Sequence, residues 1–203
     1  IFKELKGMPI IVRLLDLPLH EFLPSEEESA DAELRKRIRE LKETNPMLGH
    51  RGVRLAITSP EIYQMQIDAI AEARAEVKAD VSIMVPQVIT LQELLWVKKM
   101  VWDRGIKLGV MMETVRACMR AGRLAQVADF FSFGTNDLTQ TAFGFSRDDS
   151  GKFIQHYMTR SERCPKCGTD DEAMIEIVGT ATGQGPGTRG KRRRGDSGHG
   201  IRD

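Results

Sequence analysis

Short apolar runs alternate with longer amphipathic segments along most of this chain. Apolar runs lie at residues 8–15, 81–86, 107–112 and 130–133, and a further extended stretch is expected near Arg51. The segments between them carry apolar residues three or four positions apart, as helices do. A strand, helix, strand order predicts about five parallel strands joined by right-handed crossovers. The expected fold class is therefore α/β.

A closed barrel would need more chain than these strands provide. Closed (β/α)8 barrels take about 250 residues, whereas this sequence has 203. We predict a partial TIM (β/α)8 barrel in residues 1–158 and a divergent tail in residues 159–203. From Gly179 onward the tail is rich in glycine and arginine, which is typical of disordered segments. Because the sequence begins at Ile1 rather than Met, we expect an internal piece of a longer protein.

The last apolar run is followed by residues that suit a ligand site. Gly134 allows a sharp turn, after which Thr135, Asn136 and Asp137 present three oxygen-bearing side chains together. In folds with parallel strands, ligands bind at the carboxyl ends of the strands. A second interpretation is that Asp137 only caps a short helix that begins at Leu138.

Two arginines occupy comparable positions earlier in the chain. Arg13 lies toward the end of the first apolar run, and Arg51 is flanked by Gly49 and Gly52, which permit close approach of a ligand. A charge in a buried strand needs a partner. Arg13 therefore has two interpretations, an ion pair with Asp16 or the binding of a phosphate.

A second carboxylate completes the candidate site. Glu113 directly follows the run at residues 107–112, so it is expected at the same edge of the sheet as Asp137. Mg²⁺ prefers oxygen ligands and takes one or two carboxylates. Arginine grips phosphate or carboxylate through a planar fork of donors. This combination predicts a site for a divalent cation and an anionic substrate.

Five stretches resemble one known family. RLLDLPLHEFLP, NPMLGHRG, PEIYQMQ, MME and FFSFGTNDLTQ occur in the same order as in the phosphoenolpyruvate-utilising enzymes, and among these they are most similar to the pyruvate phosphate dikinases. The resemblance covers roughly residues 8–158. It implies a barrel that binds pyruvate or phosphoenolpyruvate (PEP), in an enzyme that makes PEP, AMP and diphosphate from pyruvate, ATP and phosphate.

The resemblance also implies roles for individual residues. Mg²⁺ would be held by Glu113 and Asp137 and would stabilise the enolate of pyruvate. Arg13 and Arg51 would hold the phosphoryl group that is transferred. Gly134, Thr135 and Asn136 would contact the substrate. All except Gly134 and Thr135 are expected to be catalytic.

Parts of the family pattern have no counterpart in this sequence. The family carries its phosphoryl group on a histidine of a separate phosphohistidine domain, binds ATP in another domain, and protonates the enolate with the cysteine of a Cys-Gly-Glu-His motif. None of these features is found here, and neither is the arginine of an earlier strand. We expect the chain to be inactive alone. The resemblance further implies a homodimer.

Two alternatives to a dikinase remain at this point. One is a relative in the same family, PEP synthase or enzyme I of the bacterial sugar phosphotransferase system. The other is a non-catalytic fragment whose tail binds zinc through Cys164 and Cys167 or binds nucleic acid through residues 191–194. A frame-shifted coding sequence would also explain the tail.

The overall composition favours neither nucleic acid nor a membrane as a partner. The formal net charge is +1, and three cysteines are too few for a disulfide framework. No apolar run approaches the roughly 18 residues of a membrane span. We therefore expect a cytoplasmic protein.

Overall fold

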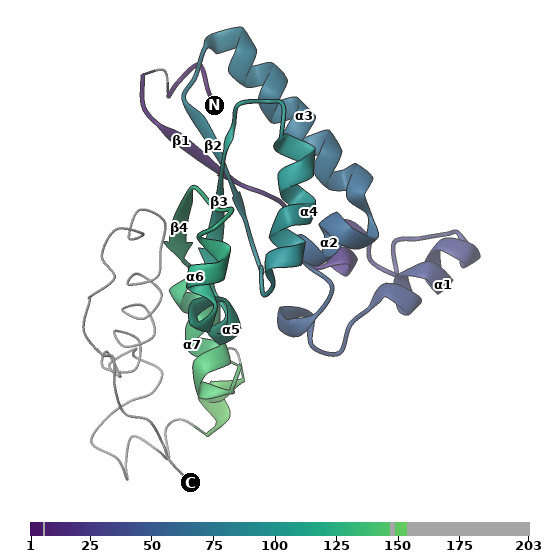
Figure 1. The fold of residues 1–203 in the computed structure, drawn as a ribbon. Helices are drawn as coiled ribbons and strands as arrows, with labels where there is room; N and C mark the ends of the chain where they lie inside the picture. The colour runs from purple at the N-terminus through teal and green to yellow at the C-terminus, as the bar shows by residue number, and fades with distance from the viewer. Residues whose placement is uncertain (6, 147–148, 154–203) are drawn as a thin grey trace, which may run out of the picture.

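Strands and helices alternate along the chain, as the sequence pattern predicts (Figure 1). The structure, a computed structural model, describes residues 1–153 except 6, 147 and 148. The predicted boundary at residue 158 and the tail beyond it lie outside the described residues. The elements are β1 (Ile10–Arg13), η1 (Leu19–Phe22), α1 (Ala32–Leu41), η2 (Pro46–Leu48), α2 (Val53–Thr58), α3 (Pro60–Val77), β2 (Val81–Val85), α4 (Leu91–Val101), β3 (Lys107–Met112), α5 (Val115–Met119), α6 (Ala121–Leu124), β4 (Phe130–Phe133), α7 (Thr135–Phe143) and η3 (Ser150–Lys152).

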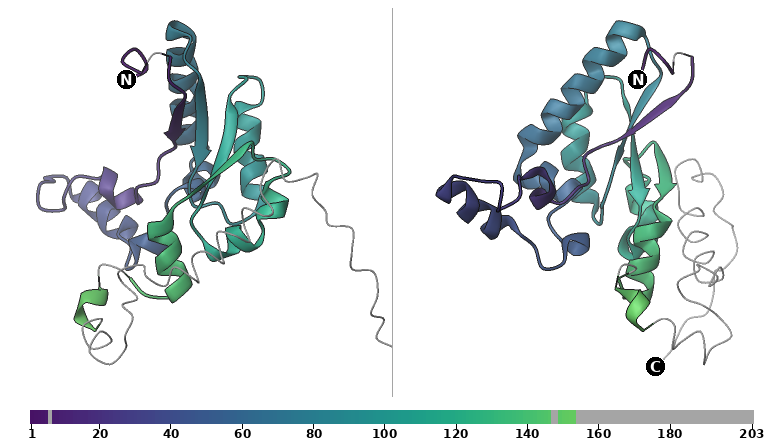
Figure 2. Two further views of the ribbon diagram at one scale, coloured as in Figure 1. Left: turned by 90° about the vertical axis from the view of Figure 1, so that its left-hand side faces the viewer. Right: turned by 180° about the vertical axis from the view of Figure 1, so that it is seen from behind.

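Four strands form one parallel sheet in the order β1-β2-β3-β4. In the register, Arg13 pairs with Met84, Val85 with Val110, and Met112 with Phe133. The carboxyl ends of all four strands therefore lie at one edge. The sheet curls as part of a barrel (Figure 2), which confirms the predicted partial barrel.

The prediction of a fifth strand near Arg51 was wrong. The residues between η2 and α2 form a loop, and α2 begins directly after Gly52. Gly52 has a φ of 59°, a left-handed conformation that a strand does not contain. The two glycines that flank Arg51 thus signal a turn into a helix.

The core lies between the sheet and the helices that connect its strands. Helices α2, α3 and α4 contact one another beside β1 and β2 (Figure 1). The central strands β2 and β3 are buried along most of their length, as expected for parallel strands covered on both faces. The largest side chains that are fully buried belong to Leu14, Val53, Leu55, Tyr63, Ile67, Ile83, Val85, Leu94, Leu108, Met112, Leu124 and Leu138.

Residues 25–43 are strongly charged and place Leu34, Ile38 and Leu41 on one face, which predicts a single helix, but the helix in the structure is shorter. Helix α1 begins at Ala32, and the Asp31 side chain caps it by accepting a hydrogen bond from the Glu33 N–H at 2.9 Å. Ser25 and Glu28 exchange the two hydrogen bonds of a capping box, each 3.3 Å long, around a separate turn.

The helices that the structure describes are all too short or too polar to span a membrane.

Candidate functional site

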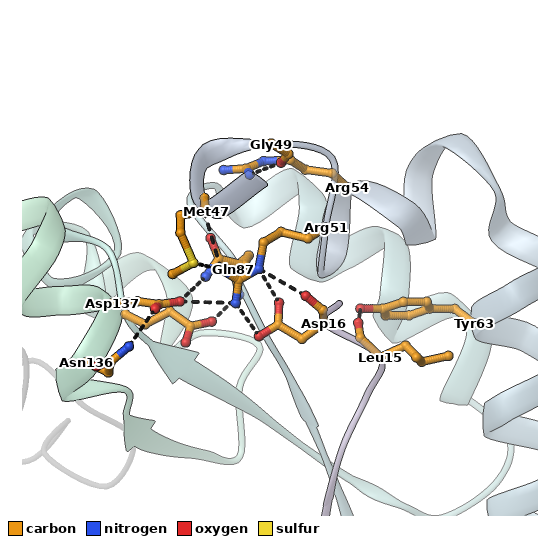
Figure 3. A network of polar contacts seen from close by, with 11 residues as sticks. Leu15, Asp16, Met47, Gly49, Arg51, Arg54, Tyr63, Gln87, Asn136 and Asp137 are labelled. Carbon is orange, nitrogen blue, oxygen red and sulfur yellow. Dashed lines mark hydrogen bonds and ion pairs between the residues drawn. The ribbon is translucent and has the colours of Figure 1, made fainter. Parts of the chain in front are cut away.

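Each strand of the sheet is followed within a few residues by a buried or half-buried polar side chain. Asp16 follows β1, Gln87 follows β2, Glu113 directly follows β3, and Asp137 lies in the first turn of the helix after β4. Because the parallel strands end at one edge, these four side chains meet there. Figure 3 shows Asp16, Gln87 and Asp137 grouped around Arg51.

Three carboxylates form a compact cluster at this edge. One oxygen atom from each of Asp16, Glu113 and Asp137 lies within 4.8 Å of the others. Arg51 pairs with two of these groups, so the three ionised carboxylates and the one guanidinium together have a net charge of −2. Buried negative charge of this kind is costly unless a cation accompanies it. The donor set is oxygen only, which suits Mg²⁺ or another hard divalent cation.

Arg51 lies at the centre of the polar network although it is in a loop. Its Nε donates to Asp16 Oδ1 at 3.1 Å, and its Nη2 donates to Asp16 Oδ2 at 2.8 Å. The same Nη2 is 3.2 Å from Asp137 Oδ2. Burial alone lowers the pKa of Arg51, but the hydrogen bonds and charge of Asp16 outweigh it and raise the pKa. Arg51 therefore stays protonated between two carboxylates.

Glu113 is the most deeply buried of the three carboxylates, with 2% of the residue exposed. Its Oε1 accepts a hydrogen bond of 2.6 Å from the Gln87 backbone N–H. Burial raises the pKa of Glu113 to about 7; the Gln87 N–H opposes this shift, and the charges of Asp16 and Asp137 add to it. A Cβ at Gly134 would lie 2.7 Å from Glu113 Oε2. Glycine at 134 is thus required for the close approach of Glu113.

Asp137 is held from two directions. Its Oδ2 accepts a 2.8 Å hydrogen bond from Gln87 Nε2 and also faces Arg51. The interpretation of Asp137 as a helix cap was wrong, because α7 begins at Thr135 and Gly134 is its N-cap. Thr135 and Asn136 are exposed beside Asp137, and Asn136 Nδ2 is 3.4 Å from Asp137 Oδ1.

Arg13 lines a different cavity from Glu113 and Asp137, the two carboxylates with which it was predicted to act. It is exposed at the end of β1, and it lines a cavity of about 370 Å³ with Asp16 and Arg51. The interpretation of Arg13 as the partner of Asp16 was wrong, because Asp16 pairs with Arg51. Within the described chain, the Arg13 side chain makes no ion pair.

Glu113 and Asp137 line a second, adjoining cavity of about 320 Å³. Met47 contributes to the walls of both cavities. Its carbonyl oxygen accepts a 3.4 Å hydrogen bond from Arg51 Nη1. Met47 is therefore shared by the cavity that Arg13 and Arg51 line and the cavity that Glu113 and Asp137 line.

Sequence reasoning missed Gln87 as a site residue, and it did not identify Arg51 as the partner of Asp16. Gln87 lies two residues beyond the end of β2, where the rule that ligands bind at strand ends would have selected it. Asp16 is positioned by α3 through its neighbour Leu15. Tyr63 Oη donates to the Leu15 carbonyl at 2.7 Å, and the Leu15 N–H donates to Gln66 Oε1 at 3.0 Å. No local pattern indicates those contacts, because they join residues 48 and 51 positions apart.

The fold and the site together define a class: a barrel protein with acidic and basic side chains at the carboxyl ends of its parallel strands. Comparison with known proteins narrows the class. The family described as PEP-utilising enzyme, PEP-binding domain, matches residues 1–164. This chain therefore belongs to the PEP-utilising enzyme family.

The curated relatives include several proteins named pyruvate, phosphate dikinase. The chain is 43% identical to that of Clostridium symbiosum over 93% of its own length, and 43% identical to that of Rhizobium meliloti (strain 1021) over 93%. It is 45% identical to that of Entamoeba histolytica over 78%. The chain spans 25%, 24% and 22% of these three relatives, about a quarter of each.

Proposed function

We propose that this chain forms the pyruvate- and PEP-binding face of a pyruvate, phosphate dikinase. The observation that carries the proposal is the meeting of Asp16, Glu113 and Asp137 around Arg51 at the carboxyl edge of a parallel sheet. The reaction is phosphoryl transfer between a phosphohistidine and the enolate of pyruvate. In the direction of PEP synthesis, the P–N bond to histidine breaks and a P–O bond to the enolate oxygen forms.

Glu113 and Asp137 are the proposed ligands of Mg²⁺. Both line the same cavity, and each has one oxygen occupied by a neutral donor from Gln87. A bound divalent cation would polarise the carbonyl of pyruvate and stabilise the enolate as a Lewis acid. Its two positive charges would balance the excess negative charge of the cluster. Asp16 accepts two hydrogen bonds from the Arg51 guanidinium and therefore fits the role of counter-ion to Arg51.

Arg13 and Arg51 are proposed to hold the phosphoryl group in transfer. Both line the cavity next to the carboxylates, and an arginine presents a fork of donors to phosphate oxygens. Arg51 is fixed by its buried ion pairs, whereas Arg13 projects from β1 in an exposed position. Catalysis by these residues consists of orientation and charge stabilisation.

Gly134, Thr135 and Asn136 are proposed to contact the substrate. They connect β4 to α7, and they adjoin the carboxylate of Asp137. The first turn of a helix directs backbone N–H groups outward, which favours an anion such as the carboxylate of pyruvate. The family resemblance supports two further parts of this proposal, a phosphohistidine domain as the partner and a homodimer. A cytoplasmic location is proposed from the composition alone.

Binding of oxalate, an anionic mimic of enolpyruvate, tests the site. We expect the 203-residue chain to bind oxalate in the presence of Mg²⁺, as measured by calorimetry, and we expect Glu113→Gln or Asp137→Asn to abolish this binding. Asp103→Asn, a change of the same kind on the loop after α4, should leave it unchanged. Retention of binding in both site variants would show that the metal is held elsewhere.

A dikinase differs from its relatives in its need for phosphate. The longer protein of which the chain is part should form PEP and diphosphate from pyruvate and ATP only when inorganic phosphate is supplied. PEP formation that is independent of phosphate would contradict the dikinase and point to a PEP synthase.

A further inference from the structure

Gln87 has a position and a backbone conformation that set it apart from its neighbours. It is 4% exposed and lies just beyond the end of β2. In the sheet, β2 lies between β1, which precedes Asp16, and β3, which precedes Glu113. Its φ is 59°, in the left-handed region. In the part of the chain that the structure describes, only one other non-glycine residue has a positive φ, namely Lys78, which ends α3. A buried residue held in a strained conformation is typical of a functional site.

Gln87 contacts two of the cluster's carboxylates with two different donors. Its backbone N–H donates to Glu113 Oε1 at 2.6 Å, and its carboxamide Nε2 donates to Asp137 Oδ2 at 2.8 Å. The left-handed backbone turns both donors toward the carboxylates. Figure 3 shows Gln87 beside Arg51, both of them in contact with Asp137. One residue at the end of β2 therefore contacts the carboxylates that follow β3 and β4.

The neighbouring chain fixes Gln87 in this conformation. A Cβ at Gly52 would lie 2.8 Å from Gln87 Cβ and 3.0 Å from Asp16 Oδ1. Position 52 therefore has to be glycine for Gln87 and Asp16 to lie where they do. The preceding carbonyl, that of Pro86, accepts a 3.1 Å hydrogen bond from the Val53 N–H. The start of α2 and residue 87 are thus packed as one unit.

We infer that Gln87 is a positioning residue, which holds Glu113 and Asp137 at the separation at which they ligate a divalent cation. The inference rests on the proposed metal role of those two carboxylates. A carboxamide suits this task because it donates a hydrogen bond without adding a positive charge that would compete with the cation. Groups that orient metal ligands typically change metal affinity 10- to 100-fold when they are removed.

Mn²⁺ binding to the 203-residue chain, followed by electron paramagnetic resonance, tests this role. We expect Gln87→Leu to weaken Mn²⁺ binding about tenfold or more. Gln87→Gly also removes the carboxamide, but it keeps the backbone N–H and relieves the left-handed strain. It should weaken Mn²⁺ binding while leaving the melting temperature equal or higher. A purely structural residue would lower both together.

Gln64→Leu is the matched control, because Gln64 Nε2 makes a comparable 3.0 Å bond to Asp68 Oδ1 on α3. It should leave Mn²⁺ binding unchanged. Unchanged affinity in Gln87→Gly, with normal binding by the unsubstituted chain, would overturn the role of Gln87 alone. If the unsubstituted chain binds no Mn²⁺, or if Glu113→Gln binds it normally, the metal site itself is refuted, and the role of Gln87 is refuted with it.

Discussion

The site has a carboxylate half, formed by Glu113 and Asp137, and an arginine half, formed by Arg13, Arg51 and the counter-ion Asp16. The two halves are organised in different ways. Glu113 and Asp137 both accept hydrogen bonds from neutral donors of Gln87, and only Asp137 also forms an ion pair with Arg51. Arg51 is held by Asp16 and Asp137, which are themselves negative, and Arg13 is exposed. The two halves share Asp137. A cation bound by Asp137 would therefore weaken its ion pair with Arg51 and make the guanidinium available to a phosphoryl group.

Removal of Asp16 should break the arginine half and have the largest effect on stability. Asp16→Asn leaves Arg51 buried with only part of its counter-charge, and loss of one partner of a buried ion pair costs about 3–5 kcal/mol. Urea denaturation measures the free energy of unfolding. The control is Glu40→Gln, which removes an exposed partner of Arg37 and should change stability by less than about 1 kcal/mol. Equal effects of the two changes would show that the Asp16–Arg51 pair does not stabilise the fold.

The pH dependence of stability tests the carboxylate half. The folded-state pKa of Glu113 is raised to about 7 from 4.5, so the folded state binds the proton more tightly than the unfolded chain does. The stability that this provides is fully present below pH 4.5 and is lost as the pH rises through 7. The loss is about 3 kcal/mol.

Glu113→Gln should remove this dependence when no divalent cation is present. The variant should therefore be more stable than the unsubstituted chain at pH 8 and similar to it at pH 4. Thermal or urea unfolding across this range, in a chelating buffer, measures the difference between the two proteins. Parallel pH profiles would contradict the raised pKa of Glu113.

Arg13 should have the smallest effect on stability and a clear effect on binding. Arg13→Gln removes an exposed side chain with no ion pair among the described residues, so it should change the free energy of unfolding by less than about 0.5 kcal/mol. The loss of a charge-assisted bond to phosphate should weaken PEP binding by the longer protein about tenfold or more. Arg116→Gln, on the exposed face of α5, is the control for a change in net charge. PEP binding that Arg13→Gln does not alter would remove Arg13 from the site.

The pattern of apolar runs was sufficient to predict β1, β2, β3 and β4, because each run is short, apolar and bounded by turn residues. The same pattern predicted a fifth strand near Arg51, where Gly52 instead adopts a positive φ and precedes α2. The charged segment from residue 25 was predicted as one helix, but the Asp31 cap places its start later. Local propensity identifies such elements more reliably than it fixes their ends.

For the site, the positions of residues near strand ends could be predicted from the sequence, but the partners of their side chains could not. Glu113 follows β3 directly and Asp137 lies in the first helical turn after β4, so the rule for parallel sheets predicts that they meet, and they do. The metal and substrate roles assigned to them remain predictions. One of the two interpretations of Arg13 paired it with Asp16, its near neighbour in the sequence, but Asp16 pairs with Arg51, which is 35 positions away.

The sequence alone determined that this chain builds parallel strands with carboxylates and Arg13 near their carboxyl ends, because apolar periodicity and turn residues act over a few positions. Only the tertiary structure decided which of those groups pair. Gln87 meets Glu113 and Asp137 across 26 and 50 positions, and Tyr63 fixes the loop that carries Asp16. Such contacts depend on the register of the strands and on the helix packed beside them, and neither is encoded by any local pattern of residues.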